Sequence, residues 1–422
     1  MVTERKKCPI CKHEEWINLD HTRNYSYWFD AELRYKEPIG FKLCKECGYL
    51  TYDITDADTM KRYYTQRRGR VTPDMIVRQN RNARAVFKFL DNDIGGENVL
   101  DIGCGSGELL GYFSQPWPVK HGIEWLPNLK AWAEKEHHIT IVEKFTRTYD
   151  RILFNHSLEH FEDPTAILED ARIALAEFGE ILVVIPMYLN QLQEAGYGLT
   201  QNFERLFQPD HYSNFNGQTI INLFNVTGLE IVKHQVVENN LYALLKVGEK
   251  KPYVKQDTAT LVSIIETQKK AIDLMAEKKY DEAIAAYPNF PDAYIAKTVE
   301  YERQKNFPEI MQILDAADKA CGYAEKLKLH RARILLQWDE GKPNIKPTMT
   351  NNIRLADDIL KELLKTIDNE EIQYYLSMIN GKYTGDHQKA VEHLENMVDI
   401  NPSKWAEVVA LKQWNYAGGD HV

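Results

Sequence analysis

The sequence contains no long apolar run, no excess of positive charge and few cysteines. Among its 422 residues no stretch approaches a membrane span, and Met1–Lys7 is too polar for a signal peptide. These two absences predict a soluble, cytoplasmic protein. Lys and Arg number 52 against 62 Asp and Glu, and the resulting net charge of -10 disfavours broad nucleic-acid binding.

A glycine-rich turn between a predicted strand and a predicted helix is the most informative segment. Val99, Leu100 and Ile102 form a short apolar run typical of a buried strand, and Glu108–Phe113 is expected to begin a helix. The three glycines lack Cβ atoms, so a ligand can lie against the backbone. They are Gly103, Gly105 and Gly107.

The spacing of these glycines is GxGxG, whereas a dinucleotide pyrophosphate site has GxGxxG. Asp101 precedes the first glycine, where a carboxylate would repel a pyrophosphate but would order the loop and attract a cationic ligand. The alternative is a glycine turn in some other α/β protein.

Strands and helices alternate after the turn, which predicts a parallel sheet. Val119–Trp125 is a second strand, and its Glu124 lies where a doubly wound fold places the acid that holds ribose hydroxyls. The further elements are a helix at Asn128–Lys135, strands at Thr140–Val142, Arg151–Asn155 and Glu180–Ile185, a helix at Gly217–Asn225, and a terminal strand pair at Glu230–Val237 and Leu241–Val247.

Four motifs in this order resemble the class I S-adenosylmethionine (SAM) dependent methyltransferases over about residues 75–248. They are Asp101–Gly107, Glu124, Phe154–Pro164 and Phe178–Pro186. The resemblance implies a Rossmann-like, seven-stranded α/β methyltransferase sheet. It also implies a set of SAM-binding residues, namely Asp101, Gly103, Cys104, Gly105, Gly107, Glu124, Trp125, Phe145, Asn155, His156 and Ser157.

Within that set the resemblance implies different roles. The loop would wrap the methionine part of SAM, Glu124 would accept hydrogen bonds from the ribose, residues near Phe145 would flank the adenine, and Asn155–Ser157 would line the methyl-bearing end. For Glu124 the alternative is a surface carboxylate. Cys104 is expected to be a small loop residue and not a nucleophile, because transfer from a sulfonium requires no protein thiol.

Two cysteine pairs near the amino terminus have the spacing of a tetrahedral zinc site. They are Cys8 with Cys11 and Cys44 with Cys47, the second pair being followed by a glycine. The residues between the pairs must form their own hairpin or loop. Disulfides are the alternative, and the absence of a secretory signal favours zinc. With four thiolates and no open position, the metal is expected to be structural.

A zinc module before a SAM domain resembles the methyltransferases that act on sugars attached to nucleotides, including sugar C-methyltransferases. The Leu158–His160 run and the Pro209–Phe215 segment also support this resemblance. In that family a histidine at the place of His211 works near the acceptor, with a tyrosine three positions earlier. Here that position is Gln208, which puts the acceptor chemistry in doubt.

His211 is the first candidate for a base that removes a proton from the acceptor, because histidine can lose its charge near neutral pH. His160 is the second, since it lies at the carboxyl side of a strand. For each the alternative is a histidine that orders a loop. Tyr212, Tyr63 and Tyr64 are further sources of a hydroxyl group.

A cluster of basic residues precedes and enters a predicted helix. Arginine forks suit phosphate groups, so a nucleotide diphosphate or a nucleic-acid backbone would fit, and a solvated helix face is the plain alternative. The cluster contains Lys61, Arg62, Arg67, Arg68, Arg70, Arg78, Arg81 and Arg84.

The chain changes character after Gly248. Glu249–Asp257 is polar and contains Pro252, which predicts a linker, and apolar residues then recur at helical spacing. Tyr280–Ile284, Ala293–Tyr294 and Lys389–Val391 resemble tetratricopeptide helix pairs. This part is expected to serve protein contact or self-association, with a structural buttress as the alternative.

The predicted domains agree with the composition, because 44% hydrophobic residues are enough for two substantial cores and a metal-stapled module. They are a zinc-binding module and substrate-side lid at 1–72, a SAM-dependent methyltransferase domain at 73–248, a linker at 249–257 and a tetratricopeptide-like domain at 258–422.

The preferred function is SAM-dependent methylation of a small molecule, a sugar carried on a nucleotide. The alternative is methylation of nucleic acid or protein recruited by the zinc module and the helical repeats. Residues 155–158 are Asn-His-Ser-Leu, whereas enzymes that methylate the amino groups of nucleic-acid bases have an Asn-Pro-Pro-Tyr signature here. This difference argues against methylation of bases. A scaffold that has lost activity is a third hypothesis, against which the intact loop and Glu124 argue.

Overall fold

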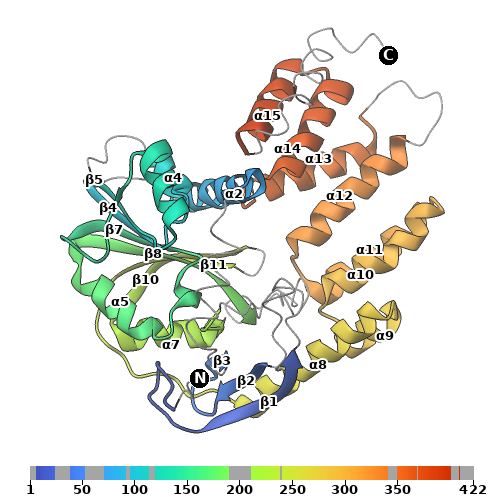
Figure 1. Ribbon diagram of the computed structural model, residues 1–422. Coiled ribbons are helices and arrows are strands. Elements are labelled where there is room, and N and C mark those ends of the chain that lie inside the picture. Colours follow the sequence, from blue (N-terminus) through green and yellow to red (C-terminus); the bar gives the residue numbers. More distant parts are fainter. Residues whose placement is uncertain are drawn as a thin grey trace. The chain divides into compact units, whose positions relative to one another are not determined.

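The computed structural model describes residues 6–23, 39–52, 71–91, 96–113, 119–189, 211–237, 240–340, 349–367, 369–400 and 408. The chain forms two compact units (Figure 1). One is made from Met1–Val71 and Ile94–Glu277, and the other from Thr72–Asp93 and Lys278–Val422.

A largely parallel sheet is the centre of the first unit. Seven strands follow the order β10-β11-β8-β7-β4-β5-β6, and β9 pairs with β8 beside this path. The strands are β4 (Asn98–Ile102), β5 (Val119–Ile123), β6 (Thr140–Ile141), β7 (Tyr149–Asn155), β8 (Leu175–Leu189), β9 (Phe215–Asn216), β10 (Leu229–Val237) and β11 (Asn240–Val247). The mixed α/β class with a central, largely parallel sheet is therefore confirmed.

Connection length explains which strands run parallel. β4 pairs in parallel with β5 and β7, and β7 with β8, because helices or long segments connect these strands. Only two residues separate β10 from β11, so this pair is an antiparallel hairpin, and β11 then lies antiparallel to β8.

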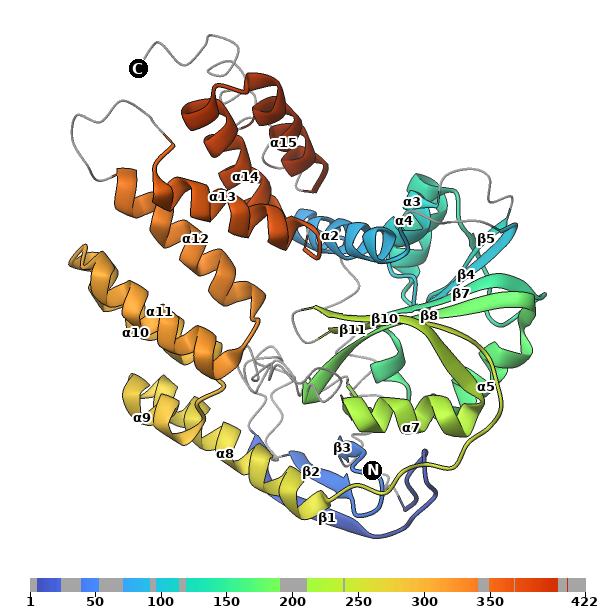
Figure 2. The same cartoon turned by 180° about the vertical axis from the view of Figure 1, so that it is seen from behind.

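Helices cover the two faces of the sheet. α5 (Pro164–Ile173) and α7 (Gly217–Thr227) lie on one face, and α4 (Pro127–His137) lies on the other (Figures 1 and 2). The short helices α3 (Glu108–Tyr112) and η2 (Leu158–His160, a 3-10 turn) follow β4 and β7. Asp163 starts α5 by accepting from the backbone N–H groups of Thr165 and Ala166, each at 3.0 Å.

The second predicted strand ends earlier than expected. The sequence predicts a strand through Trp125, whereas β5 ends at Ile123. The Glu124 carboxylate accepts hydrogen bonds from the N–H groups of Trp125 and Leu126, at 2.7 and 2.8 Å. These bonds turn the chain, so Glu124 and Trp125 do not continue the strand. Glu124 therefore lies in the turn after the strand, and α4 begins at Pro127.

The amino-terminal residues of this unit form a separate three-stranded antiparallel sheet. Its strands are β1 (Trp16–Arg23), β2 (Ile39–Cys44) and β3 (Leu50–Tyr52), in that order. β1 follows the first cysteine pair and β2 ends at Cys44, and the two strands pair antiparallel where the sequence predicts a hairpin or loop.

The predicted linker has neither helix nor strand, but it is hydrogen-bonded to its surroundings. Val254 exchanges two hydrogen bonds of 2.8 Å with the Asn222 side chain, and Gln256 donates its backbone N–H to the Glu46 carbonyl at 2.9 Å. The next helix, α8 (Thr258–Ala276), belongs to the first unit. A polar composition indicates exposure but says nothing about specific partners, so the sequence does not predict this attachment.

The second unit is helical. Its described helices are α2 (Pro73–Phe89), α9 (Tyr280–Ala286), α10 (Pro291–Arg303), α11 (Phe307–Cys321), α12 (Glu325–Glu340), α13 (Asn351–Leu364), α14 (Glu370–Met378), η3 (Ile379–Thr384, a π-helix) and α15 (His387–Ile400). Neighbouring helices bury Ile310, Leu314, Leu360 and Leu376 between them. The helical carboxyl-terminal region is confirmed.

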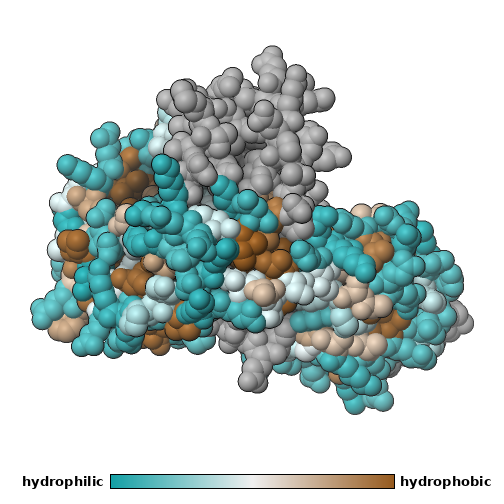
Figure 3. Space-filling view, turned by 90° about the horizontal axis from the view of Figure 1, so that it is seen from below, coloured by the Kyte–Doolittle hydropathy of each residue, from teal (hydrophilic) through white to brown (hydrophobic). Residues whose placement is uncertain are grey.

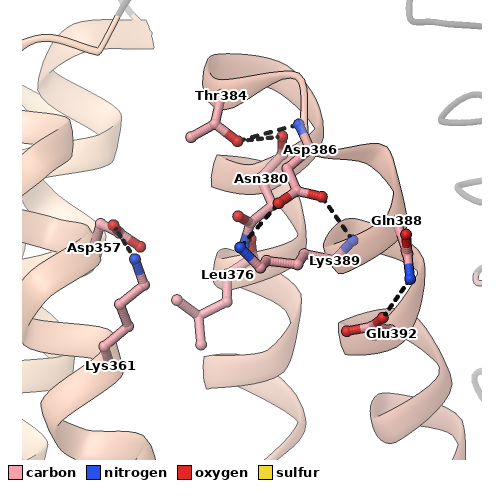
Figure 4. A network of polar contacts seen from close by, with 9 residues as sticks. All are labelled: Asp357, Lys361, Leu376, Asn380, Thr384, Asp386, Gln388, Lys389 and Glu392. Carbon is pink, nitrogen blue, oxygen red and sulfur yellow. Dashed lines mark hydrogen bonds and ion pairs between the residues drawn. The ribbon is translucent and has the colours of Figure 1, made fainter.

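Polar contacts close the turn between α14 and α15 (Figure 4). Asn380 donates to the Leu376 carbonyl at 2.8 Å, and Thr384 donates to the Asn380 carbonyl at 2.9 Å. Asp386 then forms an ion pair of 3.0 Å with Lys389 at the start of α15. These contacts satisfy backbone groups where the helix widens and ends.

On the face drawn in Figure 3 the coloured residues are mostly hydrophilic, and hydrophobic residues form scattered patches. Large exposed apolar side chains include Phe178, Ile173 and Trp125. No helix in the described part of the chain combines the length and hydrophobicity required to cross a membrane.

Candidate functional site

The glycine turn lies at the carboxyl end of β4, as predicted. Gly103, Gly105 and Gly107 have φ angles of +79°, +57° and +90°, a region that favours glycine. A Cβ atom on Gly103 would lie 2.7 Å from the Cβ of Ser157, and one on Gly107 would lie 2.5 Å from Ile139. The backbone therefore approaches its neighbours too closely for larger residues.

Asp101 is a buried acid with an unused oxygen. Its side chain is 2% exposed, and its Oδ1 has no hydrogen-bond partner among the described residues. Burial, assisted by the nearby carboxylate of Glu124, raises the pKa of Asp101 to about 8. Two acids next to a glycine turn create a site that favours a cation.

Glu124 connects the turn to the second strand. One carboxylate oxygen accepts from the Gly105 N–H at 3.1 Å, and the other accepts from Trp125 and Leu126. Glu124 is thus a partly exposed carboxylate that is fixed by backbone N–H groups at the end of the strand. Each oxygen has two lone pairs, so the carboxylate retains capacity to accept from a ligand hydroxyl.

The end of β7 contributes further polar groups beside β4, since Asp101 pairs with Leu153 in the parallel ladder. Asn155 Oδ1 and Ser157 Oγ are buried and have no hydrogen-bond partner among the described residues. His156 between them has a φ of +53°, a left-handed conformation that is uncommon outside glycine. The structure thus brings together Asp101, Glu124 and Asn155–Ser157 as the sequence predicts.

The other predicted cofactor residues have different environments. Trp125 is 47% exposed, and Phe145 is partly buried against the core of the sheet. Cys104 is buried, and burial raises the pKa of its thiol well above the usual value. A neutral, buried thiol fits a small loop residue and not a nucleophile.

Three histidines surround one buried acid after β7. Glu159 is 1% exposed, and its Oε1 lies 3.7 Å from Nδ1 of His156. Burial alone would raise its pKa, but the contact with His156 and the imidazoles of His160 and His211 lower the pKa overall. The rings of His160 and His211 are 4.9 Å apart, centre to centre. The structure therefore brings the two predicted base candidates together.

The amino-terminal module holds the His211 segment against this cluster. The Tyr212 carbonyl accepts a hydrogen bond of 2.8 Å from Thr51, and the Tyr49 hydroxyl lies 2.6 Å from the Ser213 hydroxyl. From the other side, Ser213 donates its N–H to the Glu159 carbonyl at 3.0 Å. Tyr212 is 8% exposed, and this packing makes its backbone part of the support.

The four module cysteines converge on one point. All are free, their Sγ atoms lie within 4.8 Å of one another, and two of the pairs, Cys8–Cys47 and Cys11–Cys44, are 3.5 and 3.4 Å apart. Zinc bound to sulfur at about 2.3 Å would place tetrahedral ligands about 3.8 Å apart. Gly48 follows the last cysteine with a φ of +67°, and a Cβ there would lie 2.7 Å from Leu261.

Several sequence candidates cannot be placed in the site. Gln208, Tyr63 and Tyr64 lie outside the described residues, as does the basic group Lys61, Arg62, Arg67, Arg68 and Arg70. Arg78, Arg81 and Arg84 lie on α2 in the helical unit, where Arg81 is 3.8 Å from Glu370.

Sequence reasoning did not select Glu159 or Tyr49 as site residues. In the sequence Glu159 is only the middle residue of the Leu158–His160 run. It follows His156 by three residues, a spacing at which two side chains can meet on one turn, and this spacing could have indicated their contact. For Tyr49 no local signal exists, because its contact with Ser213 spans 164 residues.

Residues 77–234 match the family model of a methyltransferase domain. No curated protein matches the chain. Among solved structures, a SAM-dependent methyltransferase from Clostridium acetobutylicum is 14% identical, with a TM-score of 0.32, over 45% of this chain and 98% of that chain.

Two further solved structures are similar over part of the chain. The plantazolicin methyltransferase BpumL in complex with a pentazolic desmethylPZN analog and SAH is 17% identical, with a TM-score of 0.33, over 46% of this chain and 92% of that chain. A DhpI-SAH complex is 17% identical, with a TM-score of 0.35, over 44% and 94%. Residues 77–234 are thus similar to a methyltransferase domain, and the chain is an enzyme, as the sequence predicts.

Proposed function

We propose that the enzyme transfers a methyl group from SAM to a small-molecule acceptor, a sugar carried on a nucleotide. The observation that carries the donor assignment is Asp101, a buried acid with an unpartnered oxygen beside a second acid. A sulfonium or an ammonium group would neutralise these carboxylates. The unpartnered oxygens of Asn155 and Ser157 offer further polar contacts at the adjoining strand end.

Different residues of the site would hold different parts of SAM. The exposed backbone of Gly103 would give room for the methionine portion, and Glu124 would accept hydrogen bonds from the ribose hydroxyls. Phe145 and Trp125 would flank the adenine, and Asn155–Ser157 would line the methyl-bearing end. When bound, SAM supplies a methyl carbon whose bond to sulfur breaks with its electron pair left on sulfur.

The chain's own part in the transfer is alignment and proton removal. His211 takes the acceptor proton as the acceptor's electron pair forms the new bond to the methyl carbon, with His160 as the second candidate. The ionised Glu159, with one oxygen within 4.8 Å of a ring nitrogen of each histidine, stabilises a protonated imidazole. The module backbone holds His211 in place through Tyr212 and Ser213.

The cysteine cluster is proposed to hold structural zinc. The four sulfur atoms lie within 4.8 Å of one another, which is compatible with the ligand set of a tetrahedral zinc site. Four sulfur ligands leave no position for a reacting group. The helical domain is proposed to be tetratricopeptide-like and to mediate protein contact or self-association.

Calorimetric titration of the zinc-loaded protein with SAM tests the donor assignment. Gly105→Arg should abolish binding because it places a long cationic side chain on the residue whose N–H binds Glu124. Gly385→Arg is a matched control, since Gly385 also has a positive φ of +72° but has nothing within 4 Å of an added Cβ. Absence of SAM binding to the wild-type protein, or its retention by Gly105→Arg, would refute the assignment.

A panel of acceptors tests the second half of the proposal. Formation of S-adenosylhomocysteine should depend on a nucleotide-sugar and not on free nucleotide, RNA or peptide. Turnover with RNA or peptide alone would replace the sugar hypothesis by methylation of a macromolecule.

A further inference from the structure

A second set of metal-ligating side chains lies apart from the cysteine cluster. One ligand atom from each of Glu159, His160 and His211 falls within 4.8 Å of the others. Ligands about 2.1 Å from a common ion are roughly 3–4 Å apart, so small side-chain rotations close this set. Two imidazoles and one carboxylate with open positions are a recognised set for first-row transition metals.

One oxygen of the Glu159 carboxylate makes no hydrogen bond to the described residues. Oε1 of Glu159 faces His156 at 3.7 Å, whereas Oε2 is buried and has no hydrogen-bond partner among the described residues. A buried carboxylate oxygen without a partner is costly, and a bound cation would remove that cost. His156 would then serve as the outer partner that orients a ligating carboxylate.

The loops that carry the three side chains are fixed to each other. The Ser213 N–H binds the Glu159 carbonyl at 3.0 Å, and the Ser213 hydroxyl binds the Phe161 carbonyl at 2.9 Å. The His160 and His211 rings meet nearly at right angles, with an interplanar angle of 79°. Ligands from two loops 52 residues apart in sequence are thus held near one point before any ion binds.

We propose that Glu159, His160 and His211 bind one divalent transition-metal ion at the carboxyl end of β7. The ion would contact an acceptor hydroxyl and lower its pKa, so that the hydroxyl proton leaves to water. With the ion bound, His160 and His211 are its ligands, and this replaces the base role proposed above for His211. This role rests on the proposed methyl transfer, whereas the binding of the ion does not. The bound ion would select an acceptor that presents an oxygen atom to it.

Manganese titration of the zinc-loaded full-length protein tests the site, because Mn²⁺ favours oxygen and nitrogen ligands over the thiolates of the cysteine cluster. The electron paramagnetic resonance signal of free Mn²⁺ should report one bound ion per chain. His160→Asn and His211→Asn should weaken binding by more than about 100-fold, because loss of even outer partners costs 10–100-fold. Glu159→Gln should do the same.

His234→Asn is the matched control, since His234 is an exposed histidine on β10 and should leave Mn²⁺ affinity unchanged. SAM titration of every variant separates a lost site from a lost fold. Equal Mn²⁺ affinity in the wild-type and His211→Asn proteins would overturn the metal site. Failure of the wild-type protein to bind SAM would instead overturn the proposed donor and leave the Mn²⁺ result standing.

Discussion

Replacing Asp101 by asparagine should remove most of the pH dependence of SAM binding. In the free protein Asp101 has a pKa of about 8, so its carboxyl is largely protonated at pH 6. A cation bound beside it favours the ionised form and lowers that pKa. Binding below pH 8 therefore releases a proton, and the affinity should rise with pH until it levels off above pH 8.

The size of the effect follows from the pKa. If the carboxyl is fully ionised in the complex, the affinity should rise about 50-fold between pH 6 and pH 8, or about 2 kcal/mol. Asparagine keeps the shape of the side chain but cannot ionise. The variant should therefore bind SAM more weakly than the wild-type protein at pH 8, with the two converging toward pH 6.

Calorimetry at pH 6, 7 and 8, in buffers of different ionisation enthalpy, measures both the affinity and the protons released. The amino group of SAM itself titrates near pH 8, so the Asp101→Asn variant provides the correction for it. Equal pH dependence in the two proteins, or equal proton release, would show that Asp101 does not neutralise the donor.

Three other perturbations distinguish the donor site from the acceptor side. His211→Ala should lower turnover at least about 100-fold with little change in SAM affinity, whether the imidazole acts as base or ligand, and unchanged turnover would remove His211 from the mechanism. Cys8→Ser should lose zinc, measured by mass spectrometry, and lower turnover while SAM still binds; Cys321→Ser, which changes a buried thiol of the helical unit, is its control. Tyr49→Phe should lower the free energy of unfolding by about 1 kcal/mol by removing the hydrogen bond to Ser213, and an unchanged denaturation midpoint would contradict this.

The glycine turn after β4 could be predicted from the sequence because its information is local. Asp101, the three glycines and the strand ahead of them lie within ten residues, and a sharp turn leaves few residue types that fit. The strand before Glu124 is two residues shorter than predicted, so Glu124 lies in the turn that follows it. Periodicity does not reveal that a side chain will accept backbone N–H groups and end a strand.

The acceptor side was less predictable because it is assembled from distant segments. His160 and His211 were identified as separate candidates, and nothing in the sequence states that their rings meet over one buried carboxylate. The support from Tyr49 and Thr51 crosses more than 160 residues. The same holds for the polar segment before α8, whose partners Asn222 and Glu46 lie in different parts of the first unit.

The charge at Asp101 also bears on how the reaction ends. Transfer of the methyl group converts a sulfonium into a neutral thioether, so the product presents one positive charge fewer to the two acids. The ionised carboxylate of Asp101 then loses part of its stabilisation in a buried setting, which favours product release. S-adenosylhomocysteine should therefore bind with a shallower pH dependence than SAM between pH 6 and 8, measured by the same calorimetry. Equal slopes for the two ligands would mean that the carboxylate senses the amino group and not the sulfur, which would move Asp101 away from the reacting end of the donor.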